Sequence, residues 1–322
     1  MKKEGFLKNI HRRGPNSIIL HGRIEGGQSP ELTFEKAIEK GINDALARIK
    51  MRFENSENPL DNLAYHNTRH TADVIRRTRE ILGVLVPNDS HLIRLGQFIA
   101  ANHDTVQDYD VVEGDGRRMR KRHRGDNEEA SAEEALAYLK AFDEKIFTQK
   151  DRELVEAAIH VTVPDFIKNE KEMYETVVQP YLSDASELLV RAVALADLGT
   201  AGMDGPEYFI EEGDALFREE NIDVGEALER PEELSEIEKE AYVHRMLTWS
   251  DGQVRFARGR QALFDKEIEG LTEDQQRAVA KLFSEFDESV QGSQARADMR
   301  KGKIDSGEWT FEDLARDFGY QI

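Results

Sequence analysis

Two histidines four residues apart are the first feature of this sequence that suggests chemistry. His66 and His70 lie in YHNTRHTADV (65–74), and a helix would place both imidazoles on one face, one turn apart. Imidazoles placed in this way can serve a single site. Two polar residues at the start of a helix are the simpler explanation, so this spacing alone does not decide between the two.

Carboxylates at the ends of two strongly apolar segments favour a functional site over the simpler explanation. His103 and Asp104 close FIAANHD, and Asp197 closes RAVALAD, which glycines follow as helix stop signals. A carboxylate beside a buried helix end needs a cation, a metal or hydrogen-bond donors, because an unpaired buried charge is costly. Each carboxylate by itself could also be a helix cap or one half of an ion pair.

Taken together, these segments supply two imidazoles and two carboxylates: His70, His103, Asp104 and Asp197. This ligand set suits Zn, Mn, Fe or Mg and leaves coordination positions open for water. Water bound to such a metal has a lowered pKa and can attack phosphorus at neutral pH. We therefore expect a divalent metal cofactor, with one or two ions.

The order H…HD…D of these residues resembles the pattern of the HD superfamily of metal-dependent phosphohydrolases. The form YHNxxHxxDV at 65–74 and the helix end ADL at 196–198 are similar to its cyclic-nucleotide phosphodiesterase-like branch. The resemblance spans roughly residues 33–260. It implies an HD-domain helical bundle with metal-dependent hydrolase activity.

The resemblance also implies individual roles. The four ligands named above would hold the first metal, and Asp104 would bridge to a second ion if one binds. His66 resembles the histidine that acts as general acid and protonates the leaving oxygen, a role that suits a pKa near 6.5. The implied catalytic residues are therefore His66 and Asp104.

Further residues would support the ligands. Asn67 and Asp73 would orient the imidazoles. Gln107 stands where the cyclic-nucleotide enzymes usually have another histidine; glutamine is a poor metal ligand but a good hydrogen-bond partner. Glu128 and Glu129 open a helix whose glutamate, by the resemblance, contacts the water at the metal. Acidic residues in a first helical turn also simply favour the helix dipole.

A polar segment, 104–127, predicts a long loop beside this site. Six of the eight residues 117–124 are Lys or Arg. Such a run would attract a phosphorylated substrate to an acidic protein, and arginine binds phosphate with paired hydrogen bonds. We expect Arg120 and Arg124 to bind phosphate, although a solvated charged loop is the simpler alternative.

The segments that must position these residues have helical periodicity, and few stretches alternate with period two. The expected helices cover 32–52, 66–85, 91–103, 128–142, 150–161, 183–198 and 242–268, and 17–20 is the best strand candidate. A pair of glutamates, Glu219 and Glu220, is expected on a solvated face. The fold class is all-α, with an N-terminal extended arm (1–30), an HD-domain helical bundle (31–268) and a C-terminal helical extension (269–322).

Composition excludes several function classes. The chain has 322 residues, with 44 Lys and Arg against 64 Asp and Glu, which gives a formal charge of −20 and argues against stable nucleic-acid binding. The absence of cysteine excludes disulfides, Cys-ligated zinc and thiol nucleophiles. We find no membrane-span candidate and no signal peptide, so we expect a cytoplasmic protein without membrane partners.

These features together predict hydrolysis of a phosphoester in a small phosphorylated compound, with a nucleotide as the favoured substrate. The YHNxxH form favours diester cleavage, because a protonated leaving group is then needed. Phosphomonoester and triphosphate hydrolysis stay open, as does the oligomeric state. The alternative is a non-catalytic HD module that binds metal and senses a nucleotide or protein partner. A helical scaffold with an acidic surface would leave the convergence of His and Asp unexplained.

Overall fold

The structure is a computed structural model that describes residues 33–114, 117–168, 170–171 and 174–321. The expected N-terminal arm and the strand candidate at 17–20 lie outside the described residues. Residues 33–322 form one compact unit. The boundary expected between residues 268 and 269 stays a prediction.

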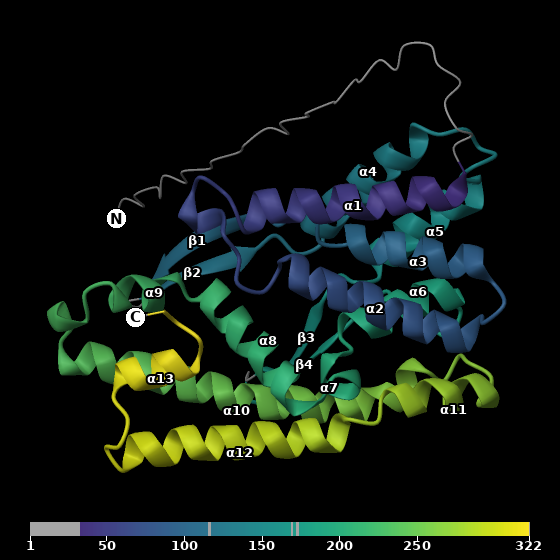
Figure 1. Cartoon of the computed structure of the whole chain (residues 1–322). Helices are drawn as coiled ribbons and strands as arrows, with labels where there is room; N and C mark the ends of the chain where they lie inside the picture. Colours follow the sequence, from purple (N-terminus) through teal and green to yellow (C-terminus); the bar gives the residue numbers. More distant parts are fainter. Residues whose placement is uncertain (1–32, 115–116, 169, 172–173, 322) are drawn as a thin grey trace, which may run out of the picture. The chain divides into compact units, whose positions relative to one another are not determined.

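The described chain is mostly helical, which confirms the all-α prediction (Figure 1). Its α-helices are α1 (Phe34–Phe53), α2 (Thr68–Leu85), α3 (Ser90–Asn102), α4 (Asp126–Lys140), α5 (Gln149–His160), α6 (Leu188–Asp197), α7 (Thr200–Met203), α8 (Gly205–Glu220), α9 (Ile222–Leu228), α10 (Glu236–Glu267), α11 (Glu273–Leu282), α12 (Phe286–Asp305) and α13 (Phe311–Asp317). Two antiparallel hairpins, β1 (Tyr109–Gly114) with β2 (Arg117–Arg122) and β3 (Asp165–Lys168) with β4 (Tyr174–Val178), complete it, together with the short 3-10 helices η1 (Pro59–Asp61) and η2 (Pro231–Glu233).

The predicted helices occur where the apolar periodicity places them, and the differences at their ends have local causes. The helix expected from 183 begins only at Leu188, because Ser183 and Ser186 hydrogen-bond each other's backbone in a turn. The helix expected from 242 begins earlier, at Glu236, because Ser235 and Glu238 form a capping box.

Three helices at the centre of the unit position the chemical residues. α2 packs against α3 and α6, and α3 also contacts α1 and α5. α3 is buried throughout its second half, from Leu95 to Asn102. A Cβ on Gly96 would clash with Leu82 Cδ1, so α2 and α3 approach closely here and a larger residue would force the Leu82 side chain to shift. The start of α2 therefore lies beside the ends of α3 and α6.

The segment predicted as a long loop contains the β1–β2 hairpin instead. Opposite charges face each other across its strands, with Asp110 opposite Lys121 and Glu113 opposite Arg118. The β-branched residues Val111 and Val112 also favour a strand over a loop. Strand β2 packs against α8 and α9, so the basic run is held against these two helices (Figure 1).

Among the described residues, no helix is both long enough and apolar enough to cross a lipid bilayer.

A buried arginine joins three of the later helices. Arg300 on α12 is fully buried, and its Nη1 and Nη2 donate to the carboxylate of Asp214 on α8 at 3.0 and 2.5 Å. Its Nε donates to Asp317 Oδ2 on α13 at 2.7 Å. Removing one partner of a buried pair leaves the other charge uncompensated, so these contacts hold α12 and α13 against α8.

We expect Arg300→Ala to lower the free energy of unfolding by about 3–5 kcal/mol, because it leaves Asp214 buried and unpaired. Urea denaturation followed by circular dichroism measures the change. Lys301→Ala, an exposed neighbour on the same helix, is the matched control and should change it by less than about 0.5 kcal/mol. Equal effects of the two substitutions would contradict a structural role for Arg300.

Candidate metal centre

The side chains of His70, His103 and Asp104 meet in one buried cluster. Their ligand atoms all lie within 4.8 Å of one another. His70 belongs to the first turn of α2, whereas His103 and Asp104 directly follow α3. Asn67 caps α2: its Oδ1 accepts from the backbone N–H groups of Arg69 and His70. Asn67 therefore orients the backbone that carries the imidazole, not the ring itself.

Asp197, the last residue of α6, faces the same cluster. Its Oδ1 lies 3.4 Å from His103 Nε2 and 3.8 Å from His70 Nε2. Asp104 Oδ2 lies 3.0 and 3.5 Å from the same two nitrogens. The other oxygen of Asp197 accepts a hydrogen bond from Gln179 at 3.2 Å. Two imidazole nitrogens and two carboxylate oxygens thus converge from α2, the end of α3 and the end of α6.

His103 shows how a cation would stabilise this cluster. Its Nδ1 donates to the carbonyl of Ala100 at 2.8 Å, so Nε2 carries the lone pair of the neutral ring. Within the part of the chain that the structure describes, Nε2 is buried and makes no hydrogen bond, although Asp104 Oδ2 is only 3.0 Å away. A lone pair that faces carboxylate oxygens is repelled unless a proton or metal lies between them. The donor set therefore fits a divalent ion.

The acid–base properties of the cluster point the same way. Burial by itself would lower the pKa of His70, but the carboxylates of Asp104 and Glu212 raise it to about 9. Burial also opposes protonation of His103, yet Asp104 and Asp197 hold its pKa well above the usual value. Protons balance the carboxylates in the metal-free protein, and a bound metal has to displace them.

Two charged residues behind His70 were not among the candidates predicted from the sequence: Glu212, which is partly buried, and Arg77, which is fully buried. Glu212 on α8 places Oε1 3.8 Å from His70 Nδ1, a buried nitrogen without a hydrogen-bond partner among the described residues. Arg77, fully buried on α2, donates to Glu212 Oε1 at 3.3 Å and to Asp204 Oδ2 at 2.7 Å. A carboxylate behind a ligating histidine fixes its tautomer and raises its basicity.

The prediction that Glu219 lies on a solvated face is wrong. Its side chain is 3% exposed, and Oε1 lies 2.5 Å from Nδ1 of His66, which is equally buried. Oε2 accepts from the backbone N–H groups of Tyr65 and His66 at 2.9 and 3.0 Å. Glu220 is partly buried, and burial together with the charge of Glu219 raises its pKa to about 7. Ala215 and Glu219 lie one turn apart on α8 and are both buried, but a glutamate adds nothing to an apolar stripe, so the sequence pattern did not mark this position as buried.

His66 lies immediately beside the ligand cluster. The Tyr65 ring packs against both histidines, with centroid distances of 4.7 Å to His66 and 4.4 Å to His70. The two imidazole centroids are 6.0 Å apart. The structure therefore brings the expected proton donor next to the expected ligands.

The residues expected to support the ligands have different positions. Gln107 donates to Asp104 Oδ1 at 2.8 Å. Glu128 is buried, and its Oε2 accepts from the backbone N–H of Gly125 at the start of α4. Glu129 is exposed on α4, and Asp73 pairs with Arg76 at 3.6 Å. Of these, Gln107 is the one in hydrogen-bond contact with a ligand.

The two arginines expected to bind phosphate are engaged elsewhere. Arg120 donates to the backbone carbonyls of Glu219 and Leu60. Arg124 is exposed, with its guanidinium 4.6 Å from the centroid of the Phe166 ring. Arg122 of the same run is the one that reaches the cluster, with Nη2 3.9 Å from Asp104 Oδ1.

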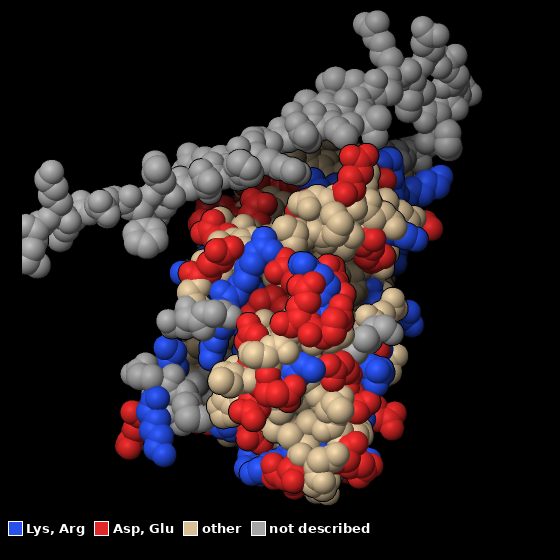
Figure 2. Space-filling model, turned by 90° about the vertical axis from the view of Figure 1, so that its left-hand side faces the viewer, with Lys and Arg blue, Asp and Glu red and all other residues tan. Residues whose placement is uncertain are grey.

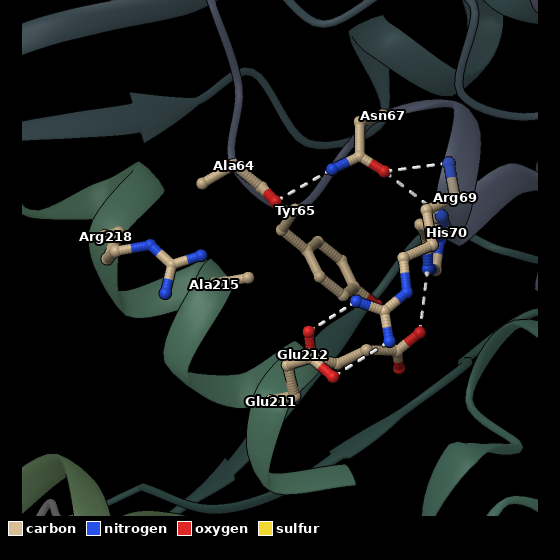
Figure 3. A pocket seen from close by; sticks show the side chains of 9 residues that line it. All are labelled: Ala64, Tyr65, Asn67, Arg69, His70, Glu211, Glu212, Ala215 and Arg218. Atoms are coloured by element: carbon tan, nitrogen blue, oxygen red, sulfur yellow. Dashed lines mark hydrogen bonds and ion pairs between the residues drawn. The ribbon is translucent and has the colours of Figure 1, made fainter. Parts of the chain in front are cut away.

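A small pocket opens beside His70, between the start of α2 and α8 (Figure 3). The Tyr65 ring and Glu212 line it together with His70. Arg69 and Glu211 form an ion pair at its edge, with Nη2 and Oε2 2.8 Å apart. The pocket is thus lined by both partners of the contact between Glu212 and His70 Nδ1.

No protein-family model, no curated protein and no solved structure matches this chain. The candidate metal-binding residues are therefore assigned from the geometry of the site alone.

We expect Glu212→Gln to weaken metal binding about 10- to 100-fold, because the carboxylate no longer supports the ligating imidazole. Titration with a competing chelator measures the affinity. Glu211→Gln is the matched control, since Glu211 is exposed and pairs with Arg69. His70→Ala should abolish binding at this centre. Metal affinity that is unchanged in both Glu212→Gln and His70→Ala would contradict the assignment.

A pH prediction follows from the raised pKa of His70. The folded value of about 9 lies above the unfolded value of 6.5, so protonated His70 stabilises the metal-free protein fully below pH 6.5. That stabilisation is lost as pH rises toward 9. We expect the melting temperature of the chelator-treated protein to fall between pH 7 and 9. The rise in melting temperature that added metal produces should become larger over the same pH interval. A metal-induced increase that shrinks with rising pH would contradict this.

Proposed function

We propose that this protein is a metal-dependent phosphohydrolase that cleaves a phosphoester in a small phosphorylated compound, with a nucleotide as the favoured class. The observation that carries the proposal is the adjacency of two groups, the convergent ligands and the His66–Glu219 pair. The imidazole centroids of His66 and His70 are 6.0 Å apart. A divalent ion held by His70, His103, Asp104 and Asp197 would supply Lewis acidity and lower the pKa of a water molecule.

His66 suits the part of a proton donor. Its Nδ1 is bonded to Glu219, which leaves Nε2 to donate a proton to a leaving oxygen. Burial alone would raise the pKa of Glu219, but His66 and the backbone N–H groups lower it to about 2. The carboxylate therefore stays ionised at neutral pH and holds the His66 ring in place through Nδ1. A donor of this kind matters most for leaving groups that cannot depart unprotonated.

The other buried groups hold this machinery in place. Glu212 and Arg77 support His70 from behind, and Gln179 fixes one oxygen of Asp197. Such buried contacts keep the ligands preorganised, so little rearrangement is needed when substrate binds. The order H…HD…D along the chain supports a relationship to the HD superfamily within this proposal.

The alternative is a module that binds metal and senses a nucleotide without cleaving it. A sensor needs the metal ligands or a nucleotide pocket, but it has no use for a buried proton donor beside them. The pair formed by His66 and Glu219 therefore favours hydrolysis over sensing.

The test is hydrolysis of a substrate panel by the metal-loaded protein. The panel comprises bis(p-nitrophenyl) phosphate, p-nitrophenyl phosphate, cyclic nucleotides, and nucleoside mono- and triphosphates, each with Mn, Mg, Zn or Fe and with chelator as control. We expect metal-dependent turnover of one class. The His66→Ala variant should still bind the metal. It should hydrolyse substrates with poor leaving groups about 10²–10⁴-fold more slowly, because these leaving groups must be protonated to depart. Activated p-nitrophenyl esters should be slowed much less.

His244→Ala is the control, because His244 is exposed on α10. Equal losses by His66→Ala on activated and unactivated substrates would argue against a proton donor. A metal-loaded wild-type protein that turns over none of the panel would favour the sensing alternative.

A further inference from the structure

Strand β2 carries a row of three arginines on one side. Arg118, Arg120 and Arg122 alternate along the strand and are partly buried, whereas Lys121 between them is exposed. Because β2 packs against α8 and α9, each guanidinium meets a different part of the protein. Acidic side chains are widespread on the face of the unit that bears the hairpin and α9, and basic ones lie among them (Figure 2).

The first two arginines have structural contacts. Arg118 pairs with Glu226 on α9. Arg120 donates to two backbone carbonyls and lies 5.1 Å from the centroid of the Tyr109 ring. These contacts hold the strand against α8 and α9, so the position of the third arginine is set by its neighbours.

Arg122 differs because it reaches the metal ligands without forming a hydrogen bond there. Its Nη2 lies 3.9 Å from Asp104 Oδ1 and 3.7 Å from Glu128 Oε1, beyond hydrogen-bond distance. Its Nε is buried and has no hydrogen-bond partner among the described residues. The side chain is 21% exposed, so the guanidinium stands between the cluster and solvent. Nη2 therefore lies near two carboxylates without being committed to a hydrogen bond with either.

Asp104 uses its two oxygens differently. Oδ2 faces the imidazoles of His70 and His103, whereas Oδ1 accepts from Gln107 at 2.8 Å and faces Arg122. A second metal ion at Oδ1 would lie next to the guanidinium, and like charges repel strongly in a partly buried site. The positive charge on this side of Asp104 is already supplied by the protein.

We propose that Arg122 binds the phosphoryl oxygens of the substrate and supplies, beside a single metal ion, the second positive charge of the site. This inference rests on the proposed function. The planar guanidinium donates two parallel hydrogen bonds to non-bridging phosphate oxygens, which phosphate monoesters and diesters both present. Arg122 thus takes the part that the sequence suggested for Arg120 and Arg124.

The experiment is calorimetric titration of inorganic phosphate into metal-loaded protein from which unbound metal has been dialysed. Bound metal is counted by plasma mass spectrometry. Arg122→Gln should bind phosphate about 10- to 100-fold more weakly than wild type, because a charged pair of hydrogen bonds is lost. Arg122→Lys should be intermediate, since lysine keeps the charge but not the fork. Arg124→Gln changes the same residue type two positions away and should bind like wild type.

One metal ion per chain is expected in the wild type and in all three variants. Equal phosphate affinity of wild type and Arg122→Gln would overturn the assignment of Arg122 and leave the proposed function standing. Two metal ions per wild-type chain would overturn the single-metal arrangement. Failure of the metal-loaded wild type to bind phosphate would overturn both the assignment of Arg122 and the proposed function. If Arg122→Gln does not fold, the test uses Arg122→Lys instead. A phosphate affinity of Arg122→Lys equal to that of wild type would then overturn the assignment of Arg122.

Discussion

The energetic cost of burying negative charge is the constraint on which the centre of this protein depends. Asp104 and Asp197 end two apolar helical segments, and Glu212 and Glu219 project from α8 into the same region. Isolated carboxylates in such surroundings would be strongly destabilising. Each one is therefore matched with a specific positive group or hydrogen-bond donor. The positions of those partners explain why the helices pack as they do.

The helices pack so that each buried carboxylate lies next to its partner. α2 contributes His70 from its first turn and Arg77 two turns later, so one helix faces both the ligand carboxylates and the carboxylate behind the imidazole. α3 and α6 present their ends, where backbone carbonyls have no partner within the helix and can accept side-chain donors. Ala100 and Ala196 are used in this way, by His103 and Arg77. Ligands placed at helix ends are held by the rigid helices before them.

The sequence revealed the parts of this arrangement that have a local pattern. The spacing of His66 and His70, the HD pair after an apolar helix and the 3.6-residue periodicity are all short-range signals. The pairing of Glu219 with His66 joins residues 153 positions apart, and no local pattern encodes such a contact. The hairpin was missed for a related reason: its cross-strand charge pairs become visible only once a register is known. Strand alternation places Arg118, Arg120 and Arg122 on one side, and only their contacts with α8 and α9 separate Arg122 from the other two.

Charge matching also bears on how many metal ions the centre needs. Arg77 offsets Glu212, and Glu219 is satisfied by His66 Nδ1 and by the backbone N–H groups of Tyr65 and His66. Glu128 lies at the start of α4, where the helix dipole stabilises a carboxylate, and burial keeps Glu220 partly protonated near neutral pH. With His70 and His103 neutral, Asp104 and Asp197 leave two negative charges, which one divalent ion balances. Arg122 lies beyond hydrogen-bond distance of Glu128 and Asp104, so its N–H groups can still bind an incoming anion, and a guanidinium fork binds a phosphoryl group with paired hydrogen bonds.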